Sequence, residues 1–250
     1  MAVNQPFFIR GDIMKKIKVG IIVADIDEYK PFTNTIEKGE FLPYSFLGRQ
    51  GHQFTVNNEK TNVNVISILC GIGKVNAAAA AMHLVDIGCD YILNYGLSGG
   101  ISGISRGEIT APDKFIEHDF DLSGIGYKLC EKPLQKYIYE ANKDLIKIAQ
   151  NVVSNIKIGM AVSGDHFICD NTVRDSLKEN FGAMSCDMET AAIAYICDFS
   201  NTPFLALRRI SDDAGSDATT DYREMNEADE TLLSDYIIEI IKELVWKQIK

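Results

Sequence analysis

The sequence of 250 residues is poor in several features that mark particular classes of protein. No apolar run approaches the roughly 18 to 20 residues that a membrane-spanning helix needs, and the N-terminal stretch MAVNQPFFIRGDIMKK has no hydrophobic signal core. The six cysteines form no Cys-x-x-Cys pair, which argues against the common zinc and redox motifs. We therefore expect reduced, buried thiols and a cytoplasmic location.

Positive charge is also scarce. The formal net charge is −10, so composition offers no electrostatic case for binding nucleic acid or an anionic membrane. The four histidines, His52, His83, His118 and His166, lack the spacing of metal ligands, and no calcium-loop pattern is present. No metal site is predicted, and we expect His118 and His166 to lie near the surface or in a pocket wall.

What the chain does contain is typical of a globular protein, with 46% apolar and 24% charged residues. Strand-like and helix-like segments alternate, which predicts one α/β domain over residues 14–250, with residues 1–13 as a loose arm or expression remnant. The central sheet should be mixed, largely parallel, twisted and flanked by helices. We expect strands at residues 17–24, 52–57, 63–69, 90–95, 108–118, 158–162, 183–188 and 203–210. We expect helices at residues 74–87, 137–153, 171–180, 189–198 and 227–249.

Polar residues follow four of the expected strands. They are residues 25–28, 70–73, 187–189 and 211–213, and each group brings carboxylates or a glycine turn to a strand end. Ligands of such sheets bind beyond the carboxyl ends of the strands. The convergence of these groups is therefore the strongest sequence indication of an active site.

Two glycine motifs are weak. The turn Gly71-Ile72-Gly73 lacks the third glycine of a dinucleotide fingerprint, and Lys74 is not followed by the Ser or Thr of a phosphate loop. This turn either only joins a strand to a helix or donates N–H groups to a ligand oxygen. Residues 96–100 match Gly-x-Ser-x-Gly, but the serine hydrolase elbow needs a following helix, whereas residues 101–107 are rich in glycine and serine.

Seven segments in register resemble the nucleoside phosphorylase/nucleosidase superfamily, and within it the 5′-methylthioadenosine/S-adenosylhomocysteine nucleosidases. They are GIIVADIDE, CGIGKVNAAAA, NYGLSGG, a GEI…HD…GY stretch, VSGDHFI, CDMETAAIA and RRISDDA, spread over residues 17–226. The resemblance implies hydrolysis of the N-glycosidic bond of an adenine nucleoside, without a metal or organic cofactor. It also implies a homodimer.

The resemblance assigns roles to individual residues. Asp212 matches the acid that protonates N7 of adenine, with Ser211 orienting it, and Glu28 matches the residue that activates water. Glu189 matches the residue that binds the ribose hydroxyls, with Met188 packed under the sugar. The remaining implied substrate-binding residues are Asp187, Phe167 stacked on the base, Ile168 at the base edge, Cys70 and Gly71 beside the ribose, Asp25 and Tyr222 at the 5′ group, and Ile125 and Pro133 reaching in from a neighbouring subunit.

The chemistry calls for these residue types independently. Cleavage passes through a cationic, oxocarbenium-like ribose that a nearby carboxylate favours. A purine anion leaves poorly, so a carboxylic acid with a raised pKa must protonate it. A base must deprotonate water on the opposite face. Apart from the resemblance, Asp212, Glu189 and Glu28 could equally be solvated or helix-capping carboxylates.

The sequence leaves two alternative functions open. Related phosphorylases carry phosphate-binding arginines where this chain has Glu28 and Asn94, and a carboxylate would repel phosphate, which favours hydrolysis. A phosphorylase and a non-catalytic nucleoside-binding or storage protein remain alternatives. The chain also departs from the usual pattern at Asp25, Cys70, Leu97 and Tyr222. We hypothesise that Asp25 and Tyr222 make the 5′ pocket polar enough for a 5′-hydroxyl to compete with a thioether.

Overall fold

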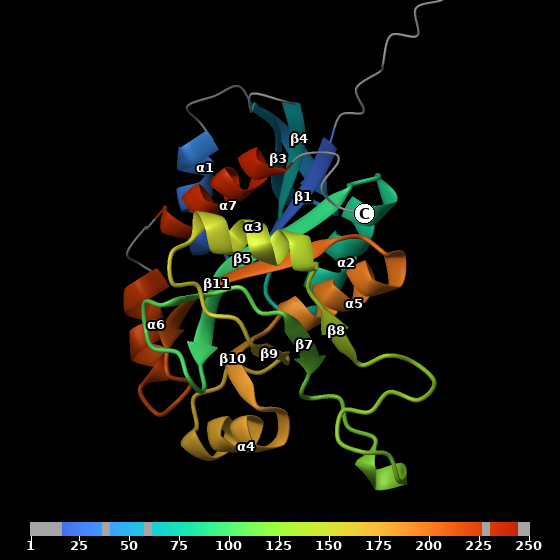
Figure 1. The fold of residues 1–250 in the computed structure, drawn as a ribbon, viewed down its shortest axis with the longest axis vertical. Helices are drawn as coiled ribbons and strands as arrows, with labels where there is room; N and C mark the ends of the chain where they lie inside the picture. Colours follow the sequence, from blue (N-terminus) through green and yellow to red (C-terminus); the bar gives the residue numbers. More distant parts are fainter. Residues whose placement is uncertain (1–16, 37–40, 58–61, 227–230, 245–250) are drawn as a thin grey trace, which may run out of the picture.

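A computed structural model describes residues 17–36, 41–57, 62–226 and 231–244. These residues form an α/β domain in which helices cover both faces of a mixed, centrally parallel sheet (Figure 1), and this confirms the fold class predicted from the sequence. The expected arm at residues 1–13 and Trp246 lie outside the described residues. Within the described part, no helix is long and apolar enough to cross a membrane.

The described residues form one eleven-stranded sheet, in the order β2-β3-β4-β1-β5-β10-β9-β7-β8, with β11 on β5 and β6 on β11. The strands are β1 (Ile17–Val23), β2 (Phe41–Phe46), β3 (Arg49–Asn57), β4 (Asn62–Leu69), β5 (Tyr91–Gly100), β6 (Ile109–Thr110), β7 (Lys114–Glu117), β8 (Ile138–Glu140), β9 (Met160–Ser163), β10 (Ala183–Asp187) and β11 (Phe204–Asp212). The helices are α1 (Ile26–Ile36), α2 (Lys74–Asp86), α3 (Lys143–Val152), α4 (Asn171–Phe181), α5 (Thr190–Ser200), α6 (Ala218–Asn226), α7 (Leu232–Glu243) and the single turn η1 (Ser123–Ile125).

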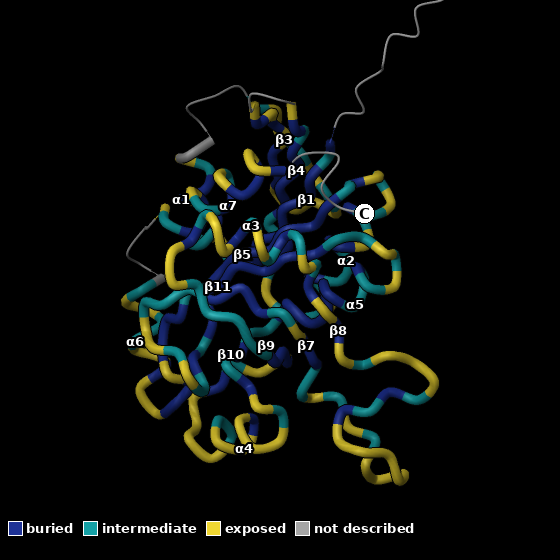
Figure 2. The backbone as a smooth tube through the Cα atoms, viewed as in Figure 1, coloured by how far each residue is buried: buried dark blue, intermediate teal, exposed yellow. Residues whose placement is uncertain are grey.

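Strand β1 explains why the sheet is covered on both sides. Its odd-numbered residues, such as Ile21 and Val23, join a core with α3 and α7, while Ile22 belongs to a second core with α2 and α5. Because side chains alternate across a strand, an unbroken apolar run such as IKVGIIV needs a helix layer on each face. The centre of the molecule is accordingly buried throughout (Figure 2).

Strand β5 is the branch point of the sheet. It runs parallel to β1 over residues 91–94 and to β11 over residues 92–99, and its last two residues pair with β10 in the antiparallel sense. Gly99 therefore faces both Cys186 of β10 and Asp212 of β11. The pairing of β11 with β5 slips between Ile210 and Asp212, so Ser211 is the extra residue of a β-bulge.

The structure corrects three sequence expectations in the middle of the chain. The strand expected at residues 90–95 continues to Gly100, because residues 96–99 stay paired with β11 and Gly100 pairs with Ser185 of β10. The expected strand at 108–118 is two short strands separated by Pro112, which has no N–H for a ladder. The expected helix at 137–153 begins only at Lys143, where Asn142 caps it, and Ile138–Glu140 form an edge strand against β7.

Other expectations were wrong at the ends of elements. Strand β2 and helix α6 were not anticipated, and the closing helix begins at Leu232, with residues 227–230 and 245–250 outside the described part. Five cysteines are buried as expected, but Cys169 is exposed, because it lies in the loop before α4.

Candidate active site

The main cavity opens at the carboxyl ends of the central strands and has a volume of about 290 Å³. This is close to the lower limit of typical small-molecule pockets. Its walls bring together residues that lie far apart in the sequence. The lining residues are Ala24, Asp25, Glu28, Ile72, Leu97, Ser98, Gly99, His166, Phe167, Ile168, Cys186, Asp187, Met188, Glu189, Ser211, Asp212 and Tyr222.

Asp212 is 2% exposed and is held in a fixed orientation at the end of β11. Ser211 Oγ lies 2.6 Å from Asp212 Oδ2, and the Ala214 N–H donates to Asp212 Oδ1 at 2.8 Å. Adjacent residues of a regular strand point to opposite faces, and the bulge at Ser211 is what allows this contact. Burial raises the pKa of Asp212 above its ordinary value, which favours the protonated form.

Glu28 reaches the same cavity from the first turn of α1. Its Oε1 accepts the Leu97 N–H at 2.7 Å, while its Oε2 is buried and has no hydrogen-bond partner among the described residues. Burial raises the pKa of Glu28 to about 8, against the lowering influence of Arg208 and of the Leu97 N–H. A Cβ atom on Gly96 would lie 2.7 Å from Glu28 Oε2 and 2.5 Å from Arg208 Nη1, so only glycine leaves room here.

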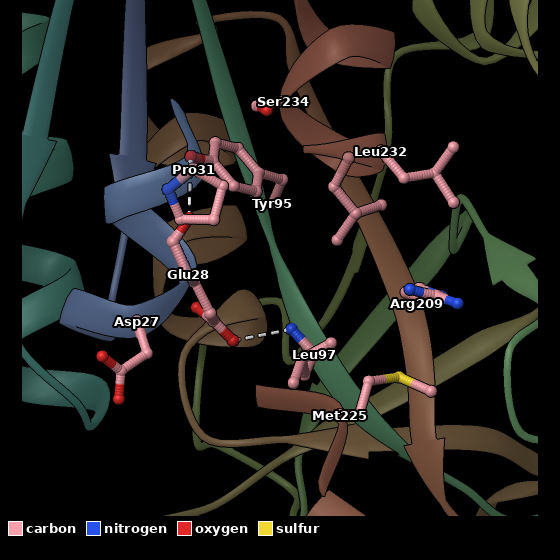
Figure 3. Close-up of a pocket in the computed structure, with 10 residues that line it drawn as sticks. Asp27, Glu28, Pro31, Tyr95, Leu97, Arg209, Met225, Leu232 and Ser234 are labelled. Carbon is pink, nitrogen blue, oxygen red and sulfur yellow. Dashed lines mark hydrogen bonds between the residues drawn. The ribbon is translucent and has the colours of Figure 1, made fainter. Parts of the chain in front are cut away.

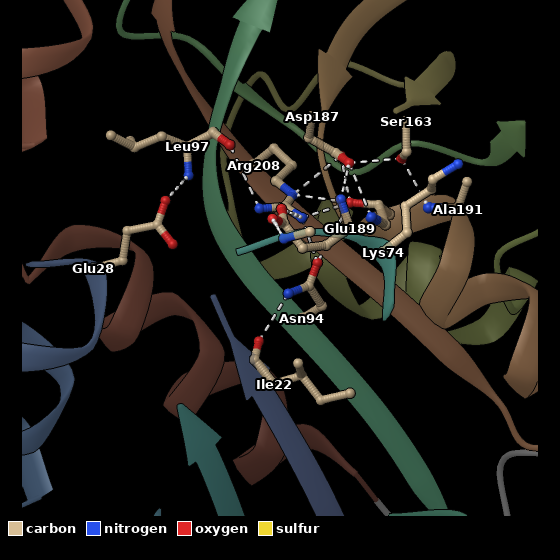
Figure 4. A network of polar contacts seen from close by, with 12 residues as sticks. Ile22, Glu28, Lys74, Asn94, Leu97, Ser163, Asp187, Glu189, Ala191 and Arg208 are labelled. Carbon is tan, nitrogen blue, oxygen red and sulfur yellow. Dashed lines mark hydrogen bonds and ion pairs between the residues drawn. The ribbon is translucent and has the colours of Figure 1, made fainter. Parts of the chain in front are cut away.

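Arg208, a buried arginine, organises the acids at the ends of β10 and α5 (Figure 4). It is 1% exposed and donates to Asn94 Oδ1 at 2.7 Å and to Thr190 Oγ1 at 2.6 Å. Its guanidinium also lies 3.5 Å from Asp187 Oδ2 and 3.7 Å from Glu189 Oε2. One cation therefore neutralises part of the charge of two buried carboxylates.

The two carboxylates differ in their surroundings. Burial alone would raise the pKa of Asp187, but Arg208 and hydrogen bonds from Ser163 and Thr190 hold it below the ordinary value. Burial raises the pKa of Glu189, and Arg208 only partly offsets this. Asp187 is thus a fixed anion that anchors the start of α5. Glu189, whose pKa is raised, is the member of the pair that can gain or lose a proton.

The glycine turn before α2 completes the wall beside Glu189. The Gly73 N–H donates to Glu189 Oε1 at 2.9 Å, and the Lys74 N–H donates to Asp165 Oδ1 at 2.8 Å. Gly71 and Gly73 have φ values of 86° and 100°, which favour glycine. Of the two functions considered for this turn, the structure shows N–H groups directed at carboxylates of the protein itself.

The aromatic side of the cavity is formed by Phe167 and Tyr222, whose rings meet edge to face with centroids 5.4 Å apart. Asp25 lies in the same cavity, and its Oδ1 accepts the Asp27 N–H at 2.7 Å. Burial raises the pKa of the Tyr222 hydroxyl, and the carboxylates of Glu28 and Asp25 add to the shift. The phenol therefore stays neutral and can donate a hydrogen bond.

Four predicted site residues are not in the cavity wall. Cys70 is buried and does not line the cavity, and its Sγ lies 3.1 Å from the Gly71 carbonyl oxygen. Gly71 belongs to the same turn as the lining residue Ile72 but does not itself line the cavity. Ile125 and Pro133 lie in the extended segment between β7 and β8, which projects from the body of the domain (Figure 1). Within one chain, this segment does not line the cavity.

The sequence reasoning also missed residues that the structure brings to the site. Arg208 is the most important of them. The sequence offered one indication of its role, because it is a charged residue inside the buried strand FLALRRISD. Ser98 lines the cavity, but it sits in an extended strand and has no elbow, which agrees with the rejection of a serine hydrolase. His166 lines the cavity, as expected for a pocket wall. Among the described residues, no cluster of His, Cys, Asp and Glu is arranged to hold a metal.

The fold and the cavity together define an α/β enzyme with an acidic site at the strand ends. The sequence profile of the phosphorylase superfamily matches residues 18–245, and the chain belongs to this superfamily. A 5′-methylthioadenosine/S-adenosylhomocysteine nucleosidase of Staphylococcus carnosus is 35% identical over 190 residues, covering 73% of this chain and 83% of the relative. These matches confirm the resemblance found in the sequence.

Solved structures of similar proteins agree with the fold. The nucleosidase of S. pneumoniae, determined with the transition-state inhibitor MT-ImmA, is 27% identical with a TM-score of 0.82, covering 92% of this chain and 100% of that one. The corresponding Helicobacter pylori enzyme with butyl-thio-DADMe-Immucillin-A has a TM-score of 0.86 at 23% identity, covering 92% and 100% of the two chains.

Proposed function

We propose that the protein hydrolyses the N-glycosidic bond of an adenine nucleoside of the 5′-methylthioadenosine/S-adenosylhomocysteine type, releasing adenine and a ribose derivative. The named relatives that align with most of its length are nucleosidases of this kind. The cavity at the strand ends has the size for a nucleoside and carries the acids that such a reaction needs.

Three carboxyl groups carry the proposed chemistry. Asp212 donates a proton to N7 of the base as the C1′–N9 bond breaks and its electron pair moves into the purine. Glu28 in its ionised form accepts a proton from water while the water oxygen bonds to C1′, and its pKa of about 8 in the empty site means that this form increases as the pH rises toward 8. Glu189 binds the ribose hydroxyls, and its negative charge favours the cationic sugar in the transition state.

The electrostatics of the ligand-free site support these roles. The raised pKa of Asp212 favours the proton that a general acid needs. The unpartnered Oε2 of Glu28 is free to bind water, while the Leu97 N–H fixes the other oxygen. Phe167, with its ring on the wall of the cavity, supplies an apolar surface for the base.

Hydrolysis is favoured over phosphorolysis by one observation, the charge of the cavity wall. Five carboxylates line the cavity, namely Asp25, Glu28, Asp187, Glu189 and Asp212, whereas no lysine or arginine is among its described lining residues. Asn94 donates its Nδ2 to the Ile22 carbonyl at 2.8 Å and accepts from Arg208, so its amide is fully engaged. A phosphate dianion would find no lysine or arginine among these lining residues and would meet repulsion from the ionised Asp187, whereas water would meet neither obstacle.

The deciding experiment measures adenine release from methylthioadenosine with and without phosphate, for wild type and Asp212→Asn. We expect release that does not depend on phosphate and that the substitution lowers by about 100- to 1,000-fold. Release only with phosphate would assign phosphorolysis and remove the role of Glu28. No release in either buffer would leave the binding or storage function, and a panel of nucleosides would test for another substrate.

We also propose that the protein is a homodimer. Val75 and Met82 on α2 and Phe199 on α5 are 80%, 51% and 82% exposed, and these two helices pack against each other. Ile125 is also 74% exposed, on the projecting segment between β7 and β8. A second copy would cover these side chains and bring Ile125 and Pro133 toward the neighbouring cavity.

Light scattering tests the assembly directly. Wild type should have twice the mass of one chain, and Phe199→Asp should shift it toward the monomer. A monomeric wild type at micromolar concentration would contradict the proposal. A cytoplasmic location is likewise a proposal, supported by the six cysteines, all of which are free.

A further inference from the structure

A second, smaller cavity lies behind Glu28, on the side of α1 and α7 (Figure 3). Its volume is about 40 Å³, whereas a single water molecule needs roughly 10–15 Å³ on this measure, so it has room for about three waters. The lining residues are Asp27, Glu28, Pro31, Tyr95, Leu97, Arg209, Met225, Leu232, Leu233 and Ser234.

Glu28 and Leu97 form part of the wall of both cavities. The Glu28 carboxylate therefore stands between the space for the nucleoside and the smaller cavity. The Leu97 N–H binds only Oε1, and Oε2 is buried without a partner among the described residues. A buried carboxylate oxygen without a donor is costly, and water is the usual partner for such an atom.

The smaller cavity is polar enough to hold water. Asp27 and Arg209 contribute polar groups in addition to Glu28. Pro31 lies inside α1 and has no N–H to donate to the Asp27 carbonyl, which removes the usual i+4 partner of that oxygen. A water beside Glu28 would thus find the several polar partners that an ordered water requires.

The lining of the cavity includes both buried and exposed side chains. Ser234 and Tyr95 are each 2% exposed, whereas the Asp27 side chain is 42% exposed. A nucleoside in the main cavity would stand between Glu28 and the open mouth of that cavity.

We propose that this smaller cavity stores the water that the reaction consumes and admits its replacement from solvent. The inference rests on the proposed hydrolytic function and adds Ser234 and Met225 as residues that set the size of the water space. Glu28 then takes its water from behind, while the nucleoside enters from the front.

The test fills the smaller cavity without touching the main one. Ser234→Val and Ser234→Ala both lose the hydrogen bond of Ser234 Oγ to the Thr231 carbonyl, but only valine occupies the water space. For Ser234→Val we expect kcat in phosphate-free buffer to fall at least tenfold, with the Kd of a non-hydrolysable adenine nucleoside within twofold of wild type. Ser234→Ala should keep kcat within twofold.

Equal kcat values for the two Ser234 variants would overturn the proposal, as would a loss of kcat matched by an equal loss of nucleoside binding. If valine at position 234 prevents folding, Met225→Phe narrows the cavity from half-buried helix α6 and should lower kcat at least fivefold; an unchanged kcat overturns the proposal there too. Failure of the hydrolytic function itself is recognised separately, because wild type would then release no adenine without phosphate.

Discussion

The Leu97 N–H donates to Glu28 Oε1 at 2.7 Å and so joins the start of α1 to strand β5 across 69 residues of sequence. The bond fixes one carboxylate oxygen and leaves the other buried without a hydrogen-bond partner among the described residues. The position of the proposed base thus depends on a main-chain group, so the identity of residue 97 matters less for this contact than the extended course of β5.

Asp212→Asn should lower kcat by about 100- to 1,000-fold with little change in KM, because an amide cannot protonate the leaving base. Adenine release at saturating substrate measures the effect. Asp213→Asn is the matched control, since that side chain is 69% exposed, and it should stay within twofold. A similar loss in both variants would contradict the assignment of the general acid.

Glu28→Gln should make the protein more stable at alkaline pH. The folded-state pKa of about 8 lies above the ordinary 4.5, so the folded chain holds a proton that the unfolded chain releases. The contribution of Glu28 to stability is therefore complete below about pH 4.5 and is lost as the pH rises through 8. We expect Tm of the variant to exceed that of wild type by roughly 5 °C at pH 8.5, and by much less at pH 4.5.

Calorimetry at several pH values checks this expectation. Glu179→Gln, an exchange at an exposed position of α4, should give a difference in Tm near zero at each pH. A constant difference for Glu28→Gln across the pH range would contradict the raised pKa.

Arg208→Met should destabilise the fold by about 3–5 kcal/mol, because it leaves Asp187 and Glu189 buried without their cation. Urea unfolding measures the loss. Arg106→Met removes the ion pairs with Asp221 and Glu224, but the Arg106 side chain is 39% exposed and the cost should stay below about 1 kcal/mol. Equal costs for the two arginines would show that Arg208 does not hold the acids.

Gly96→Ala should reduce activity strongly while leaving most of the fold intact. The new Cβ would come within 3 Å of both the Glu28 carboxylate and Arg208 Nη1, so one of the two must move. We expect kcat to fall at least tenfold. Gly124→Ala is the control, because nothing lies within 4 Å of its Cβ position, and it should behave as wild type.

Asp25→Leu should raise the preference for methylthioadenosine over adenosine. A carboxylate accepts a hydrogen bond from a 5′-hydroxyl but gains nothing from a thioether, and the difference is worth about tenfold in the ratio of kcat/KM values. Tyr222→Phe should move the ratio in the same direction by a smaller factor. A wild type that already shows a large preference for the thioether would refute the hypothesis of a polar 5′ pocket.

Much of this architecture could be predicted from the sequence. The apolar run of β1 predicted a two-sided sheet, and the acids after β1, β10 and β11 predicted the edge where the cavity lies. Periodicity could not reveal β8, because Ile138–Glu140 is a strand only by pairing with β7, a tertiary contact. Arg208 was missed for a related reason: its partners come from two other parts of the chain, Asn94 from β5, and Asp187 and Glu189 from the junction of β10 and α5.

The bulge at Ser211 has a consequence for how such a site can be lost. It places two consecutive side chains of β11 on one side, which puts the serine hydroxyl 2.6 Å from the acid. Deleting one codon of β11 before Ser211 would shift the pairing of the strand by one residue. The side chains of Ser211 and Asp212 would then point to opposite faces, although both residues would still be encoded. Variation among natural sequences should therefore spare the length of this strand as strictly as it spares the aspartate.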